Sequence, residues 1–289
     1  MGDQNQASVD IIICTRDRCE DLTATIENLQ RPEVTQGHAV TLTVVDNGSS
    51  DATRQVVQEH NGSYLPARYH YHREGGLASA RNAGLAVTDQ PWVVFIDDDV
   101  RPQAGWLAAM IEPLMARRFD AVVGTIRPAE HLRRQWMGTA IASALALNNH
   151  EPITNATPNL IGANMAFRRA VLEHVPGFDP QLDPGGLGYG GDTLFSMQLG
   201  EAGLKVGRAS DAVVDHHFHA DRLLRESLLS SAKGFARSRR YINRTYGLWL
   251  DEWETCKLLV VLIKLGLFYA GHPLAFKQRE GCSLSLIHI

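Results

Sequence analysis

The sequence predicts an α/β fold in which a mostly parallel central sheet is flanked by helices and followed by a C-terminal helical tail. Three observations support this prediction. Short apolar runs recur through the first 120 residues, each run is followed by a polar turn, and each turn leads into a helix-compatible stretch. This alternation is typical of a parallel sheet with helices on its faces.

The predicted strands of this first half are rich in β-branched and apolar residues, and they cover 9–14, 40–45, 67–71 and 92–96. Helices are predicted over 21–30, 51–59, 77–86 and 105–116, with Ser50 as the N-cap of the second helix. Because ligands of such sheets bind outside the carboxyl ends of the strands, polar residues at those ends should meet in one crevice.

The second half of the chain is less regular. It contains a predicted strand at 121–124, an apolar segment at 159–167 and a glycine-rich loop at 183–191. A basic, helix-compatible segment then runs from Arg222 to Tyr246, and it is interpreted either as a solvated helical face or as a contact for phosphates or anionic lipid.

Composition excludes several classes of protein. The chain has 289 residues, of which 44% are hydrophobic, and its formal charge of −4 provides no sequence-wide basic field for nucleic acid. We therefore expect no nucleic-acid partner. The four cysteines, at positions 14, 19, 256 and 282, lack the spacing of a metal site or the density of a disulfide scaffold, which favours reduced thiols in the cytoplasm.

Targeting and membrane signals are weak. Residues 1–8 form a polar tail without the features of a secretory signal, so we expect a cytoplasmic catalytic part. The apolar run from Leu258 to Ala270 contains Lys264 and is shorter than the ~20 residues that span a bilayer. It is predicted to be a core or membrane-surface helix. The last six residues, 284–289, look like a translated sequencing adapter, and 276–289 are treated as a truncated or artefactual tail.

The strongest local signal is a predicted buried strand that ends in three carboxylates, Asp97, Asp98 and Asp99. Crowded carboxylates repel one another unless a cation lies between them. Mg²⁺ or Mn²⁺ prefers such oxygen ligands together with substrate phosphates. A solvated acidic turn is the alternative interpretation.

Two further turns carry weaker signals. The run Asp46 to Asp51 is, by itself, a turn leading into a helix. The run Arg73 to Asn82 contains Gly76 at a helix start and Arg81, which could approach a pyrophosphate. It lacks the spacing of a Rossmann or Walker loop, which disfavours dinucleotide binding.

In this order along the chain, the segments resemble the family-two glycosyltransferases of GT-A fold, from about residue 9 to about residue 240. The resemblance implies a Rossmann-like sheet, an inverting reaction, a nucleotide diphosphate sugar donor and a divalent metal. It assigns the nucleotide sugar to Thr15, Arg16, Asp46, Gly76, Arg81, Asp97, Asp98 and Asn164. It also implies one glycosyltransferase domain over 9–220, with a donor half at 9–120, an acceptor half at 121–220 and a C-terminal helical segment at 221–275.

The same resemblance implies the remaining roles. Asp99 matches the metal ligand of the family's DxD element, and His216 matches a histidine that completes the metal site, with His217 in reserve. Asp192 matches the catalytic base, although the residue before it is Gly191 where the family usually has an acid. A satisfied amide in a buried strand is an equal interpretation of Asn164, and a helix N-terminal carboxylate is the alternative for Asp192.

The expected reaction transfers a sugar to a hydroxyl of a glycan, a lipid-linked glycan or a small molecule, in the cytoplasm or at the inner face of a membrane that the C-terminal helices touch. Two other functions remain open. A non-catalytic nucleotide-sugar binding protein would account for Gly191, and a nucleotidyl- or phosphotransferase would also use an acidic cluster at a strand end.

Overall fold

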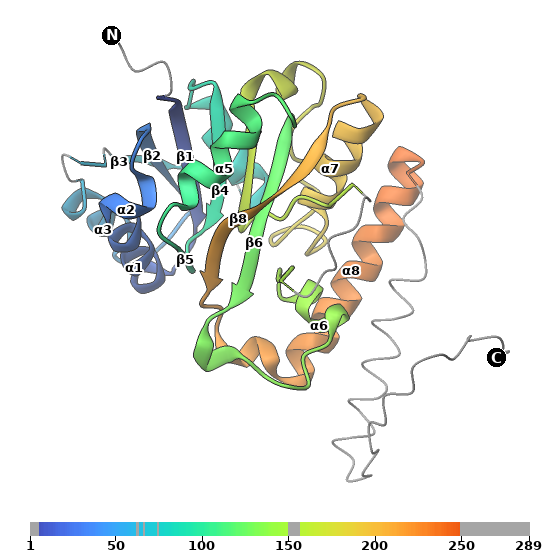
Figure 1. Cartoon of the computed structure of the whole chain (residues 1–289). Coiled ribbons are helices and arrows are strands. Elements are labelled where there is room, and N and C mark those ends of the chain that lie inside the picture. The colour runs from blue at the N-terminus through green and yellow to red at the C-terminus, as the bar shows by residue number, and fades with distance from the viewer. Residues whose placement is uncertain (1–5, 62–63, 66, 74, 150–156, 249–289) are drawn as a thin grey trace, which may run out of the picture.

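The computed structural model describes residues 6–61, 64–65, 67–73, 75–149 and 157–248. Figure 1 shows one sheet with helices packed around it and a long helix along one side. The strands are β1 (Ser8–Thr15), β2 (Ala39–Asp46), β3 (Ala67–Tyr71), β4 (Trp92–Asp97), β5 (Val100–Pro102), β6 (Ala121–Pro128), β7 (Asn164–Arg168) and β8 (Val206–His216). The α-helices are α1 (Cys19–Leu29), α2 (Pro32–Thr35), α3 (Thr53–Glu59), α4 (Leu77–Ala86), α5 (Trp106–Met115), α6 (Thr139–Ala144), α7 (Gly191–Glu201) and α8 (Arg225–Tyr246).

The strands form one mixed sheet in the order β3-β2-β1-β4-β7-β6-β8-β5. The first four strands are parallel to one another, whereas β7 runs antiparallel to both β4 and β6. At the far edge β8 is parallel to β6 and antiparallel to the short β5. The predicted α/β fold with a mostly parallel sheet and a C-terminal helix is confirmed.

Alternating side chains of the strands fill the core on both faces of the sheet. Ile11 and Ile13 of β1 pack on one face with apolar residues of α1, α3 and α5. Ile12 points to the other face and packs with residues of α4 and α7. This is the period of two that a strand imposes on its side chains, and it explains why the buried strands are apolar at nearly every position.

The elements of the first half lie within about two residues of their predicted bounds, but one predicted cap is wrong. Helix α3 begins at Thr53 after the N-cap position Ala52, and Ser50 lies outside the helix. The Ser50 hydroxyl instead donates to Oδ1 of Asp17 at 2.9 Å. The Asp51 carboxylate accepts the backbone N–H of Thr53 at 3.0 Å, so an aspartate performs the local role expected of the serine.

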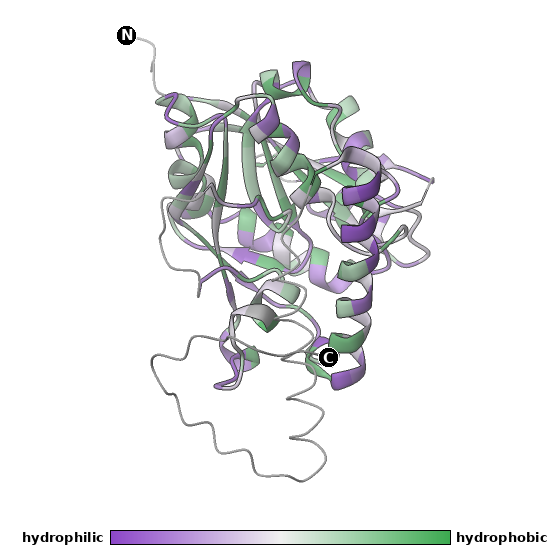
Figure 2. Cartoon of the chain, turned by 90° about the vertical axis from the view of Figure 1, so that its right-hand side faces the viewer, coloured by the Kyte–Doolittle hydropathy of each residue, from purple (hydrophilic) through white to green (hydrophobic). Residues whose placement is uncertain are grey.

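From Arg225 to Tyr246 the basic segment forms the 22-residue helix α8, as predicted, whereas Arg222 lies in a preceding 3-10 helix, Ala220–Leu223. The buried positions of α8 are Leu228, Gly234, Ser238 and Ile242, which contact the rest of the domain. Figure 2, which looks onto this side of the molecule, shows hydrophilic residues along the helix. No helix within the described part of the chain is long and apolar enough to cross a membrane. The apolar run 258–270, the tail 276–289, Cys256, Cys282 and residues 1–5 lie outside the described residues.

Candidate active site

A cavity of about 580 Å³ opens outside the carboxyl ends of β1 and β4. Its walls come from the turn after β1, the acidic turn after β4, the segment that precedes β7, the glycine-rich loop before α7, and α8. These segments are distant in sequence, and the parallel strands bring the first two to the same edge. Of the residues predicted to bind donor, metal or acceptor, the lining includes Thr15, Arg16, Gly76, Arg81, Asp97, Asp98, Asp99 and Asp192.

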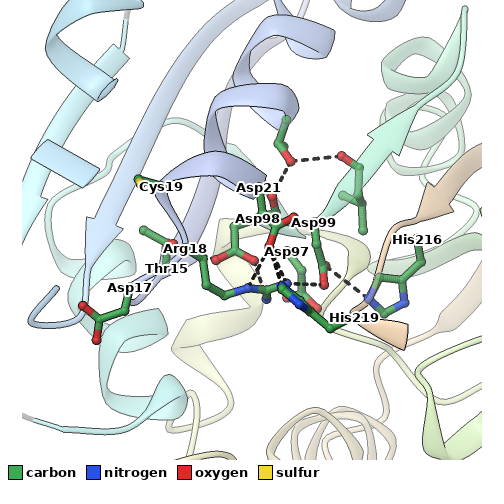
Figure 3. Close-up of polar contacts among 12 residues, drawn as sticks. Thr15, Asp17, Arg18, Cys19, Asp21, Asp97, Asp98, Asp99, His216 and His219 are labelled. Atoms are coloured by element: carbon green, nitrogen blue, oxygen red, sulfur yellow. Dashed lines mark hydrogen bonds and ion pairs between the residues drawn. The ribbon is translucent and has the colours of Figure 1, made fainter. Parts of the chain in front are cut away.

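The acidic turn is held by its neighbours as well as by the strand. The Thr15 hydroxyl donates to Oδ2 of Asp98 at 2.6 Å. The Arg18 guanidinium lies between two carboxylates, with Nη1 2.7 Å from Oδ1 of Asp98 and Nη2 2.7 Å from Oδ2 of Asp99. Figure 3 shows Arg18 reaching across to this cluster. Burial raises the pKa of Asp98 to about 7, although Arg18 opposes the shift.

A group suited to a cation lies beside this ion pair. Ligand atoms of Asp97, Asp99 and His216 all fall within 4.8 Å of one another. His216 ends β8, and the pairing of His216 with Val100 of β5 brings the imidazole to the acidic turn. Figure 3 shows His216 and Asp99 facing each other.

Unsatisfied polar atoms support the assignment of this group to a metal. Nε2 of His216 lies 3.1 Å from Oδ1 of Asp99, in an orientation that makes no hydrogen bond, so both atoms are buried without a hydrogen-bond partner. Buried polar atoms rarely stay unpaired. Burial alone raises the pKa of Asp99, but His216 and Arg18 outweigh burial and hold this pKa below its usual range. Two carboxylates and an imidazole are a suitable donor set for Mn²⁺, so the residues fit a divalent metal.

The turn after β1 separates its two arginines. The Arg16 side chain is 61% exposed and lies 3.6 Å from the Asp17 carboxylate. Asp17 adopts φ 52°, in the left-handed region, and Arg18 beyond it reaches the acidic turn. The prediction named Arg16, which lines the cavity, and did not name Arg18, whose guanidinium holds the acidic turn. Spacing alone could not distinguish them, because the choice depends on the backbone conformation of the residue between them.

Asp46 is buried at the end of β2 and is used by the fold. Its Oδ1 accepts the backbone N–H of Ser49 at 2.7 Å, and its Oδ2 accepts the Tyr69 hydroxyl at 2.6 Å. Among the described residues, the next one, Asn47, lines the cavity and Asp46 does not. The structure therefore brings the turn, rather than the Asp46 carboxylate, to the cavity.

Asn164 lies in the core and not in the cavity wall. Its Oδ1 accepts the indole N–H of Trp106 at 2.9 Å, and its Nδ2 donates to the carbonyls of Ala212 at 2.8 Å and Thr125 at 3.2 Å. The amide is thus fully satisfied, as the alternative interpretation of this residue expects. The segment directly before it, 161–163, lines the cavity instead.

Asp192 lies in the first turn of α7 with its carboxylate at the cavity. Oδ2 accepts the backbone N–H of Gly162 at 3.1 Å, and Oδ1 accepts that of Thr193 at 2.8 Å. The fold therefore fixes the direction of this carboxylate.

A second carboxylate near Asp192 was not predicted from the sequence. Asp183, in the glycine-rich loop, lies 3.0 Å from Nη1 of Arg81, and Arg81 is 4.0 Å from Asp97. Burial raises the pKa of Asp183 to about 6, Arg81 lowers it and Asp192 raises it. Arg81 thus links the acidic turn to the side of the cavity that contains Asp192.

Comparisons with known proteins find glycosyltransferases of similar sequence. The chain is 27% identical over 191 residues to a pre-mycofactocin glycosyltransferase of Mycobacterium tuberculosis, covering 63% of this chain and 38% of that protein. It is 25% identical over 177 residues to the glycosyltransferase AglE of Haloferax volcanii, covering 60% of this chain and 55% of that protein. The chain therefore spans between about a third and somewhat more than half of these relatives.

Among solved structures, the mannosyltransferase PcManGT of Pyrobaculum calidifontis, in complex with GDP-Man and Mn²⁺, superposes with a TM-score of 0.61 at 21% identity, covering 93% of this chain and 77% of that one. Glucosyl-3-phosphoglycerate synthase of Mycobacterium tuberculosis, in complex with Mn²⁺, UDP-glucose and phosphoglyceric acid, gives a TM-score of 0.54 at 20% identity, covering 80% of this chain and 79% of that one. At these identities the likeness shows a shared fold.

The family itself is settled by the sequence. The model of glycosyl transferase family 2 matches residues 10–175, which begin within β1 and contain β2 to β7 and the whole acidic turn. This match covers more than half of the chain, so the protein belongs to glycosyl transferase family 2.

Proposed function

We propose that this chain transfers a hexose from a nucleoside diphosphate sugar to a hydroxyl acceptor, with inversion at the anomeric carbon and with a divalent metal. One observation carries the proposal. The possible metal ligands Asp97, Asp99 and His216 lie close together, and Asp99 lines the same cavity as Asp192. A cation site and a directed carboxylate base are the two elements that a metal-dependent inverting transfer uses.

On the donor side, Asp97, Asp99 and His216 would hold Mn²⁺ or Mg²⁺, which when bound neutralises charge on the departing diphosphate. Thr15 and Arg18 fix the Asp98 carboxylate beside this group. Gly76 and Arg16 also line the cavity, and we expect the nucleotide to lie against them. GDP-mannose and UDP-glucose, which the structural neighbours bind, are the donor types we expect for this chain.

On the acceptor side, Asp192 is proposed to remove the proton of the attacking hydroxyl. Its carboxylate is oriented by Gly162 and Thr193 and needs no rearrangement to face the cavity. General-base assistance of this kind contributes about 10²–10⁴-fold to the rate. Attack from the face opposite the leaving diphosphate inverts the anomeric configuration in a single displacement. Hydroxyls of glycans, lipid-linked glycans and small molecules are the proposed acceptors.

The helix α8 offers a surface for an acceptor carried on a membrane. Four of its exposed residues repeat at helical spacing on one face, namely Lys233, Arg237, Arg240 and Arg244. Such a face attracts anionic lipid, with about 1 kcal/mol per basic residue close to the surface. We therefore propose peripheral contact with the cytoplasmic face of a membrane. Cosedimentation with vesicles of anionic and of neutral lipid tests this membrane contact. If a variant with glutamine at all four positions bound anionic vesicles as strongly as the unchanged protein, the proposed contact would be contradicted.

The catalytic assignment is tested by comparing Asp192→Asn with the unchanged protein. We expect transfer to fall by about 10²–10⁴-fold, because the amide cannot accept the proton, while the dissociation constant of the donor changes little. Glu201→Gln, at the exposed opposite end of α7, is the matched control and should retain turnover. Unchanged turnover in Asp192→Asn would refute the assignment.

A further inference from the structure

The space beside Gly191 is already filled by a carboxylate from another part of the chain. A Cβ atom built on Gly191 would lie 2.7 Å from Cγ of Asp183 and closer still to its Oδ2. Real Cβ atoms do not approach other atoms this closely, so the Asp183 carboxylate must move if position 191 carries a side chain. Position 191 has no carboxylate of its own, but the Asp183 carboxylate, from eight residues earlier in the chain, lies beside it.

Asp183 adopts a backbone conformation that favours glycine. Its φ is 64°, in the left-handed region, which costs a residue with a side chain about 1 kcal/mol. Its carbonyl accepts the backbone N–H groups of Gly186 at 2.9 Å and Gly188 at 3.0 Å, and these bonds hold the turn closed. Position 191, by contrast, is not in the left-handed region. The backbone at position 183 would thus suit a glycine, and the backbone at position 191 would suit an aspartate.

Both carboxylate oxygens of Asp183 have partners that belong to the site. Oδ1 accepts the first backbone N–H of α7, from Gly191, at 2.8 Å. Oδ2 accepts Nη1 of Arg81 at 3.0 Å. Asp183 is 4% exposed and still lines the cavity beside Asp192. One side chain therefore connects the beginning of the helix that carries Asp192 to the buried arginine that faces Asp97.

We propose that Asp183 is the positioning residue of this site: it replaces, from the glycine-rich loop, a carboxylate at position 191, and it fixes both the beginning of α7 and Arg81. The proposal rests on the proposed function only for the role of Asp192. A displacement of about 1 Å in a reacting group can cost about 10²-fold in rate, which is the scale on which a lost positioning residue acts.

Exchanging the two residues tests this inference. The single variant Asp183→Gly should lower kcat by about 10- to 100-fold, with the donor dissociation constant within about twofold, because the α7 start and Arg81 lose their common partner. The single variant Gly191→Asp should be unstable and inactive, since its side chain collides with Asp183. The double variant Asp183→Gly/Gly191→Asp should regain most of kcat, because the carboxylate returns from the other side of the same space.

A matched control is Gln181→Gly, which places a glycine at an exposed position two residues before Asp183 and should leave kcat unchanged. Full activity of Asp183→Gly would overturn the proposal, and so would a folded double variant no more active than Asp183→Gly. Thermal unfolding of the unchanged protein, the two single variants and the double variant supplies a readout independent of turnover. Gly191→Asp should lower Tm when Asp183 is present, and much less when it is combined with Asp183→Gly. Equal decreases in Tm would contradict the proposal that the two side chains occupy the same space. If the unchanged protein transfers no sugar, that result counts against the proposed function and not against this inference.

Discussion

Replacing Arg18 by alanine should show how strongly the acidic turn depends on a cation. Nη1 and Nη2 of Arg18 each lie 2.7 Å from a carboxylate oxygen, of Asp98 and Asp99 respectively. Both carboxylates are almost completely buried. Removing the guanidinium leaves two negative charges side by side with no arginine between them.

The cost follows from burial. Removing one partner of a buried ion pair destabilises a protein by roughly 3–5 kcal/mol. The Arg18 side chain is 31% exposed, so solvent screening reduces the expected loss to about 2 kcal/mol. For a domain of this size that corresponds to a decrease in Tm of about 4–8 °C. The same change at Arg16, which is 61% exposed and lies 3.6 Å from the exposed Asp17 carboxylate, should alter Tm by less than about 1 °C.

Manganese should reverse the loss. At a free concentration of about 100 times Kd, a ligand that binds only the folded state adds about 2.7 kcal/mol. Mn²⁺ should therefore raise the Tm of Arg18→Ala more than that of the unchanged protein, because the guanidinium no longer competes for Asp99. Thermal scans with chelator or with Mn²⁺ measure both effects. Equal Mn²⁺ shifts in the two proteins would refute the reasoning.

Three further changes test other parts of the site. His216→Ala should weaken Mn²⁺ binding by about 10- to 100-fold in calorimetric titration, whereas the exposed His219→Ala should not; equal affinities would contradict the metal assignment. Asn164→Ala removes three buried hydrogen bonds and should lower the urea unfolding free energy by about 2–4 kcal/mol, and a donor-binding defect without this loss would argue against a core role. The pKa of Asp183 is about 6 in the folded protein and 3.8 in the unfolded chain, so the folded protein binds the proton more tightly. The stability that this proton contributes is fully present below pH 3.8 and is lost as the pH rises from 3.8 to about 6. The stability of the protein relative to Asp183→Asn should therefore fall by at most about 3 kcal/mol between pH 4 and pH 7, and a rise would contradict the shift.

The regular part of the fold could be predicted because local pattern and burial agree there. Strands β1 and β4 are buried on both faces, and the predominantly apolar runs 9–14 and 92–96 indicate this directly. The acidic turn was predictable for a related reason, since carboxylates at the end of a buried strand need a cation. His216 came from the resemblance, and the structure places it against Asp99 through the pairing of β8 with β5.

Other features depend on conformation that no local pattern reveals. The choice between Arg16 and Arg18 follows from the left-handed backbone of Asp17. Asp183 reaches position 191 only because the glycine-rich loop folds back on α7, and a sequence does not show which of its carboxylates will fill a gap. Asn164 was ambiguous from sequence because its three partners come from three other segments of the chain.

The most direct test of the proposed function is an assay of the purified protein with a panel of nucleoside diphosphate hexoses and hydroxyl acceptors. Release of nucleoside diphosphate and formation of glycoside are followed with Mn²⁺ or Mg²⁺ and with chelator. We expect one donor to be consumed only when metal is present, with an inverted anomeric linkage in the product. Metal-dependent donor binding without transfer to any acceptor, or release of pyrophosphate instead of nucleoside diphosphate, would contradict the proposed reaction.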